Sequence, residues 1–162
     1  FIGNWDRHNG NWGFLYNQET DEMKIAPVYD CGSSLYPQAD EEVMRLVLSD
    51  AGERGTRIYN RPVSAIRIGD KKINYYDYIS SMENEDLNKA LLRIVPRITE
   101  NGIYKIIDGI SAISELQREF YSTMLVERKH IILDETYNKL VDKSKVLNAK
   151  NEVCIRKNHR GE

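Results

Sequence analysis

Three oxygen-bearing side chains near the start of the sequence, Asp6, Asn11 and Asp30, have the types and spacing of a metal-dependent site. Asp6 and Asn11 lie in GNWDRHNGNW, residues 3–12, and Asp30 lies in PVYDCGSSLYP, residues 27–37. Carboxylate and amide oxygens are the ligands that Mg²⁺ prefers in proteins. If the chain folds so that these side chains meet, they could hold a divalent cation.

The residues between Asn11 and Asp30 are predicted to form a β-hairpin. Aromatic and branched residues at 12–16 and 23–29 flank a polar link that is rich in turn formers. A link of about five residues pairs positions whose numbers sum to about 40 or 41, which places Asn11 opposite Asp30. Opposed residues have Cα atoms roughly 4.5–5.5 Å apart, so these two side chains could share one cation. Asp6 would face the same spot from the loop that precedes the first strand.

The same stretch resembles the HipA-like serine/threonine kinases, a family that includes the CtkA-type bacterial kinases. Their catalytic segment N-x-D-x-H-x-x-N is matched here by Asn4, Asp6, His8 and Asn11, and their metal-binding Asp follows a Tyr, as Asp30 follows Tyr29. The resemblance implies that Asp6 is the base that takes the substrate hydroxyl proton and that Asn11 and Asp30 hold Mg²⁺ next to ATP. His8 is expected to orient the loop through a hydrogen bond.

The resemblance also implies what the complete protein contains and binds. ATP, Mg²⁺ and a protein with a Ser or Thr acceptor are the expected ligands. HipA-type toxins work with a DNA-binding antitoxin, so an antitoxin-like protein partner is a further expectation. We find no glycine-rich phosphate loop and no strand Lys with a helix Glu partner, and these are expected in an N-terminal lobe that precedes Phe1. The chain is therefore expected to be part of a longer protein and to have little or no kinase activity alone.

Other functions remain open at this point. The chain could be a non-catalytic regulatory or partner-binding module with a vestigial site. It could also be a phosphotransferase for lipids or small molecules, because type II phosphatidylinositol 4-kinases carry similar D-R-x-x-x-N and D-N-G strings. A His-Asn-His nuclease is disfavoured, since no second His lies within usable range.

Composition narrows the class of protein. The 162 residues include 41% apolar and 30% charged residues, as in a globular domain, and a net charge of −2 argues against direct nucleic-acid binding. Only two cysteines occur, Cys31 and Cys154, so no zinc site or disulfide framework is expected. No apolar run approaches the length of a membrane span, and we expect a cytoplasmic protein.

The predicted fold class is mainly α: a helical kinase-like C-terminal lobe with a short N-terminal β-hairpin that carries the catalytic loop and the metal-binding Asp. Helices are expected at 39–51, 75–82, from Asn84 to a kink or end at Pro96, at 103–110 after a break at Asn101-Gly102, and from Ser111 or Ser114 to about Lys143. Residues 31–37 occupy the place of an activation segment, and residues 52–74 are predicted to be an irregular loop.

We expect one domain at residues 1–143, made of a site segment at 3–37 and a helical scaffold at 38–143. Residues 144–162 lose periodicity and are predicted to be a poorly ordered tail. Its basic end at 156–160 could contact an acidic partner.

Overall fold

Helices make up most of the chain, as the sequence predicts. The computed structural model describes the backbone of residues 1–158 and their side chains, except those of Asn9 and of residues 147–158. The helices are α1 (Glu41–Ser49), α2 (Ala51–Tyr59), α3 (Tyr75–Ser80), α4 (Glu85–Ile94), α5 (Glu100–Asp108), α6 (Glu115–Arg128) and α7 (Glu135–Asn158), with 3₁₀ turns at Asn9–Asn11 and Val95–Arg97 and a π-helical segment at Lys129–Asp134. The strands form two separate antiparallel hairpins, β1 (Phe14–Asn17) with β2 (Glu22–Ile25) and β3 (Val63–Ile68) with β4 (Lys71–Asn74).

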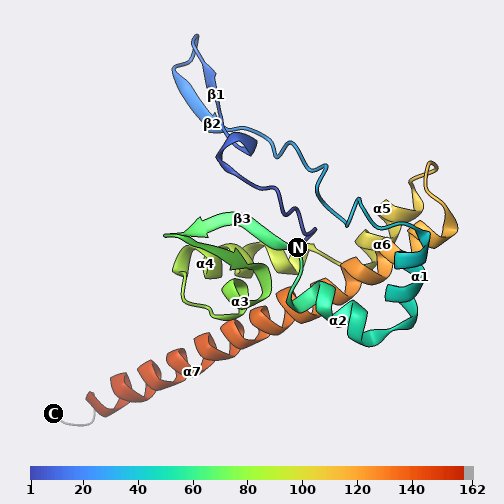
Figure 1. Cartoon of the computed structure of the whole chain (residues 1–162). Helices are drawn as coiled ribbons and strands as arrows, with labels where there is room; N and C mark the ends of the chain where they lie inside the picture. The colour runs from blue at the N-terminus through green and yellow to red at the C-terminus, as the bar shows by residue number, and fades with distance from the viewer. Residues whose placement is uncertain (159–162) are drawn as a thin grey trace.

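The predicted N-terminal hairpin is present, but its predicted register is wrong. Phe14 pairs with Ile25 and Asn17 with Glu22, so each partner lies one or two residues earlier than expected. The reason is a shorter connection, closed by Asp21 at a φ of 53°. The ladder ends at Phe14, so Asn11 is not directly opposite Asp30 across paired strands. In Figure 1 this hairpin projects away from the helical body.

The predicted irregular loop at 52–74 is also wrong. Its first part is helix α2, which begins because the Asp50 side chain accepts hydrogen bonds from the backbone N–H groups of Gly52 and Glu53. Its second part is the β3–β4 hairpin, whose two-residue turn has Gly69 at a φ of 59°. Gly followed by a polar residue between two short β-prone runs is a hairpin signal. Gly69 and Asp70 form such a pair, so the hairpin could have been predicted from the sequence.

The core lies between α1, α4, α6, α7 and the π-helical segment. The fully buried side chains Val47, Phe120, Met124 and Ile132 form its centre. Helix α6 packs against α1 and α5, and α7 packs against α4. Figure 1 shows α6 and α7 as one long diagonal that supports the other helices. Apolar side chains at steps of three and four residues along these helices account for this packing.

The long C-terminal helix begins at one of the two predicted residues and ends later than predicted. Ser114 caps α6 through a capping box with Gln117. At Lys129–Asp134 the helix widens to a π-helix, in which residues five apart come together, and the Lys129 ammonium lies 2.6 Å from the Asp134 carboxylate. Helix α7 then continues to Asn158, past the predicted end near Lys143. The predicted basic end at 156–160 lies outside the residues whose side chains are described.

Helix α4 begins and ends as predicted, whereas α5 begins three residues before its predicted start because one predicted break is absent. Asn84 caps α4, and the regular helix ends just before Pro96, both as predicted. Asn101 and Gly102 do not interrupt the chain. They lie inside α5 because the Thr99 hydroxyl caps this helix by accepting a hydrogen bond from Gly102 N–H.

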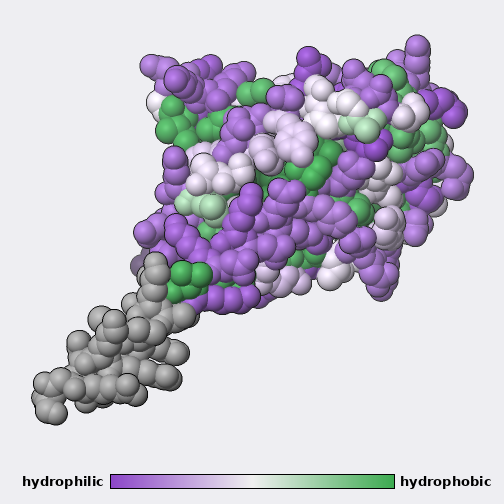
Figure 2. Space-filling model, turned by 90° about the horizontal axis from the view of Figure 1, so that it is seen from below, coloured by the Kyte–Doolittle hydropathy of each residue, from purple (hydrophilic) through white to green (hydrophobic). Residues whose placement is uncertain are grey.

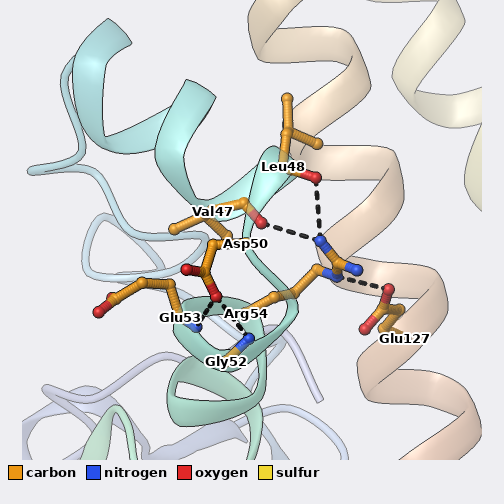
Figure 3. A network of polar contacts seen from close by, with 7 residues as sticks. All are labelled: Val47, Leu48, Asp50, Gly52, Glu53, Arg54 and Glu127. Atoms are coloured by element: carbon orange, nitrogen blue, oxygen red, sulfur yellow. Dashed lines mark hydrogen bonds and ion pairs between the residues drawn. The ribbon is translucent and has the colours of Figure 1, made fainter.

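A charged joint fixes α2 against α1 and α6 (Figure 3). The Arg54 guanidinium of α2 donates to the carbonyl oxygens of Val47 and Leu48, 2.9 and 3.0 Å away, near the end of α1. It also contacts the Glu127 carboxylate of α6 at 2.7 Å. One side chain thus satisfies the last carbonyls of one helix and connects it to another.

The surface is mostly polar on the face that Figure 2 shows, where hydrophobic residues form only small, separate patches. Within residues 1–158, no helix combines the length and the apolar composition that crossing a bilayer requires. The cytoplasmic location and the domain division at residue 143 stay predictions.

Candidate functional site

The Asn11 side chain folds back onto the loop that carries Asp6. Its Nδ2 atom donates to the Asp6 carbonyl oxygen at 2.8 Å, and the residue is 4% exposed. The intervening turn is stabilised by His8, whose Nδ1 atom accepts from Gly10 N–H at 3.0 Å. His8 therefore makes the kind of loop contact expected of an orienting group. Asp6 and Asn11 are held in one compact turn by these two contacts.

Asp30 is held against the same turn, although strand pairing does not bring it there. The Asp30 carbonyl oxygen accepts from Asn4 Nδ2 at 3.0 Å, and the neighbouring Tyr29 carbonyl accepts from Arg7 Nη1 at 2.8 Å. The Tyr29 hydroxyl donates to the Gly10 carbonyl at 3.0 Å. Three hydrogen bonds thus join residues 29 and 30 to the segment from Asn4 to Gly10. Loop contacts beyond the hairpin ladder therefore hold the backbone of Asp30 next to the segment that carries Asp6. That the three side chains share one cation stays a prediction.

The backbone at Asp30 adopts an uncommon conformation. Its φ is 54°, in the left-handed region that few residues other than Gly occupy. Asp is among the residues that tolerate this region best. The side chain is exposed and takes part in none of the described ion pairs. Leu35 and Tyr36, in the segment that follows, adopt the same conformation.

The oxygen atoms of this region are of the types that bind a hard divalent cation. No three His, Cys, Asp or Glu side chains gather into a metal-binding group in the described part of the chain. Asn11 uses its amide nitrogen on Asp6, which leaves its side-chain oxygen for another partner. Next to Asp30, the Oδ1 atom of Asn4 is buried and has no hydrogen-bond partner among the described residues. One carboxylate with amide oxygens and water is a donor set that suits Mg²⁺.

A buried arginine that the sequence analysis missed connects the first residue of the chain and the end of the site segment to α6. Arg128 is 1% exposed. Its Nε atom donates to the Phe1 carbonyl at 2.8 Å, and its Nη1 atom donates to the Tyr36 hydroxyl at 3.2 Å and the Arg57 carbonyl at 3.0 Å. Arg128 lies four residues after Met124, on the apolar side of α6. A charged residue on such a stripe is the signal that could have identified it.

Tyr36 closes the segment that follows Asp30. Its hydroxyl donates to the Arg57 carbonyl at 2.6 Å, and the Arg57 guanidinium lies 5.8 Å from the centre of its ring. Burial raises the pKa of the Tyr36 hydroxyl, while the positive charges of Arg128 and Arg57 oppose that shift. The residue therefore stays neutral and anchored in the place of the expected activation segment.

Two clefts lie beside the loop that carries Asp6. One, of about 450 Å³, lies between Trp5, the segment 36–39 and the start of β3. The other, of about 700 Å³, is lined by Arg7, His8, Gly10 and Trp12 on one side and by residues 65–67 of β3 on the other. Strand β3 is joined to the loop by a hydrogen bond from Ala65 N–H to the Trp5 carbonyl at 2.9 Å. Along the chain, Asp6 thus lies between Trp5 of the first cleft and Arg7 of the second, although Asp6 itself lines neither cleft.

Comparison with known proteins gives one clear relationship. No family model matches the chain. The serine/threonine-protein kinase CtkA of Helicobacter pylori is 51% identical over 144 residues, which are 88% of this chain and 44% of CtkA. The crystal structure of the Helicobacter pylori proinflammatory kinase CtkA superposes with a TM-score of 0.83 and covers 88% of this chain and 52% of that structure's chain. The predicted resemblance to CtkA-type kinases is confirmed, and this chain spans less than half the length of that relative.

Proposed function

Because this chain is homologous to part of the serine/threonine-protein kinase CtkA, we propose that it is the C-terminal lobe of an ATP- and Mg²⁺-dependent protein serine/threonine kinase. The observation that carries the proposal is the 51% identity over 88% of the chain, a stretch that is homologous to a kinase. The turn that joins Asp6 to Asn11 and the loop contacts that hold Asp30 support the assignment of site residues.

In this proposal Asp6 accepts the proton of the substrate hydroxyl. The side chain is half-buried and takes part in none of the described ion pairs, so its carboxylate is available to a ligand. The hydrogen bond from Asn11 to the Asp6 carbonyl fixes the backbone from which this carboxylate extends. A base held in one position favours transfer because the acceptor hydroxyl needs little further ordering.

Asn11 and Asp30 would hold Mg²⁺, which neutralises phosphate charge when bound. Asn11 contributes its side-chain oxygen, since its amide nitrogen is already used within the turn. Asp30 contributes a carboxylate whose backbone is fixed by Asn4. Most of the work of these residues is positioning and charge stabilisation, because phosphoryl transfer asks little covalent chemistry of the protein.

The exposed side chains of the β1–β2 hairpin are evidence for a second, N-terminal lobe in the complete protein. Its large apolar side chains are exposed, among them Phe14, Leu15, Met23 and Ile25, which are 56%, 58%, 64% and 74% exposed. Such a cluster is a docking surface more often than a free one. We propose that the N-terminal kinase lobe covers it. Protein substrates and an antitoxin-like partner remain proposals that no described residue identifies.

The test replaces Asp6 in the complete protein that contains this chain. Asp6→Asn and Asp6→Ala should lower phosphotransfer from ATP to Ser- or Thr-containing peptides by about 10²- to 10⁴-fold, the usual contribution of a positioned base. Circular dichroism and the affinity for ATP should stay near those of the unchanged protein. The control is Asp86→Asn, because the Asp86 side chain on α4 is 95% exposed. Full activity in both Asp6 variants would remove this residue from its assigned role.

A further inference from the structure

On the basis of the proposed function, we propose that the cleft between Arg7 and β3 binds an acidic residue of the protein substrate, close to the serine or threonine that receives the phosphate. The cleft has a volume of about 700 Å³, enough for one or two side chains of an extended peptide. Its lining begins at Arg7, the residue directly after Asp6. A peptide whose hydroxyl reaches Asp6 therefore passes next to this cleft.

Two guanidinium groups give the cleft its chemical character. Arg7 lines one side and Arg67 lines the other. Each donates to a neutral backbone carbonyl, Arg7 to Tyr29 at 2.8 Å and Arg67 to Asp70 at 2.6 Å. Neither takes part in any of the described ion pairs. Neither guanidinium group is therefore paired with a described carboxylate, each has further N–H groups for an anionic ligand, and a carboxylate fits the planar guanidinium group well.

The β3–β4 hairpin concentrates more positive charge at this place than its own stability favours. Arg67 lies directly opposite Lys72 across the two strands, and Lys71 is paired with Ile68 next to them. Like charges in directly opposed positions destabilise an antiparallel pair. Asp70 is the one acidic residue between Val63 and Asn74, in a chain whose net charge is −2. A bound carboxylate would reduce the repulsion between Arg67 and Lys72. The two cationic residues are therefore better explained by binding of an acidic ligand than by the stability of the hairpin.

The remaining lining favours a peptide over a free anion. Trp12 is 50% exposed and Ile66 is 43% exposed at the same cleft, so apolar surface lies beside the guanidinium groups. An amino-acid side chain offers both an apolar stem and a charged end, and its neighbours in the peptide can cover the Trp ring. We therefore assign the cleft to an Asp or Glu of the substrate.

The experiment measures substrate preference in the complete protein. Ser-containing peptides that carry Asp or Glu near the acceptor are compared with otherwise identical peptides that carry Asn or Gln. The unchanged protein should show a kcat/KM for the best acidic peptide on the order of tenfold above that for its amide counterpart, which is what one charge-assisted hydrogen bond supplies. Arg67→Ala should bring this ratio close to one, and Arg67→Glu should reverse it in favour of a Lys-containing peptide.

Arg93→Ala is the matched control, because Arg93 is an exposed arginine on α4 outside the cleft, and its ratio should equal that of the unchanged protein. Thermal melting checks folding, and Lys72→Glu replaces Arg67→Glu if the latter does not fold.

An unchanged ratio in Arg67→Ala would overturn the assignment. So would a raised KM for ATP at an unchanged ratio, since the cleft would then serve the nucleotide. Absence of any phosphotransfer would overturn the proposed function itself, whereas transfer without acidic preference would overturn only the assignment of this cleft.

Discussion

Arg128 shows how a single buried charge can hold a site together. It donates to groups of residues 1, 36 and 57, which are far apart in the sequence, and it takes part in none of the described ion pairs. Its charge is therefore stabilised by carbonyl and hydroxyl oxygens. Hydrogen bonds from a charged donor are stronger than neutral ones, and here they offset part of the cost of burying the charge, although the Nη2 atom has no partner among the described residues.

Tyr36→Phe should reduce the loss of stability that the protein undergoes above about pH 10. Burial raises the pKa of the Tyr36 hydroxyl above its ordinary value of 10.0, so the folded chain holds this proton more tightly than the unfolded chain. The resulting stabilisation is complete below that ordinary value and is lost as the pH rises through the folded-state pKa. Urea unfolding followed by circular dichroism from about pH 8 to about pH 11 measures the effect.

Alkaline pH changes the stability of both proteins, so the prediction concerns the difference in unfolding free energy between them. The gap in unfolding free energy between the unchanged protein and Tyr36→Phe should narrow as the pH rises. A gap that stays constant over the whole range would contradict the prediction.

The sequence identified the candidate residues of the site but not the contacts that position them. Asp6, Asn11 and Asp30 stand out because their types and spacing have a chemical meaning. Arg128 could be identified from its position on the apolar stripe of α6, but its contacts could not, because its partner at Phe1 is 127 positions away. The hydrogen bond from Asn4 to Asp30 depends likewise on how two loops meet, which no periodic pattern encodes.

At the scale of elements, the joint of Figure 3 shows how short helices are kept in place. Helices α1 and α2 each contain 9 residues and would be marginal in isolation. Arg54 supplies donors to the end of α1 and an ion pair to α6. Helix α2 leads into β3, so this joint also fixes the strand that lines the substrate cleft.

Arg54→Met should lower the free energy of unfolding by about 1–3 kcal/mol, because two carbonyl groups and one carboxylate lose their donor. The side chain is 19% exposed, so water replaces these contacts only in part. Arg45→Met is the control: Arg45 and Glu41 are both largely exposed, and such pairs are worth little. Urea unfolding of both variants measures the difference. Equal losses in the two would show that the joint does not stabilise the fold.

Element prediction succeeded where helix caps and breakers were strong and failed where local signals conflicted. Ser114, Asn84 and Pro96 marked boundaries correctly. The stretch 52–74 was mistaken for a loop because its glycines suggested irregular structure. In the folded chain Asp50 caps a helix through Gly52, and Gly69 closes a hairpin, so these glycines belong to regular elements.

At the scale of the whole molecule, the chain should not be an active kinase by itself. It spans 44% of the length of CtkA, and the apolar side chains of its β1–β2 hairpin are exposed. Incubated with ATP and Mg²⁺, the isolated chain should show no phosphotransfer above background and no nucleotide-dependent rise in Tm, whereas the complete protein should show both. If the isolated chain transferred phosphate at the rate of the complete protein, the proposal that activity requires both lobes would be contradicted.

The π-helical turn at Lys129–Asp134 has an evolutionary consequence. Such a turn holds one residue more than the α-helical path that it replaces, and each residue rotates an α-helix by about 100°. Deleting one residue there would rotate α7 about its own axis and carry Thr136 and Leu140, both buried, away from the core. Length changes inside this turn should therefore be rare among homologous genes, while the loop at 111–113 should accept insertions more readily.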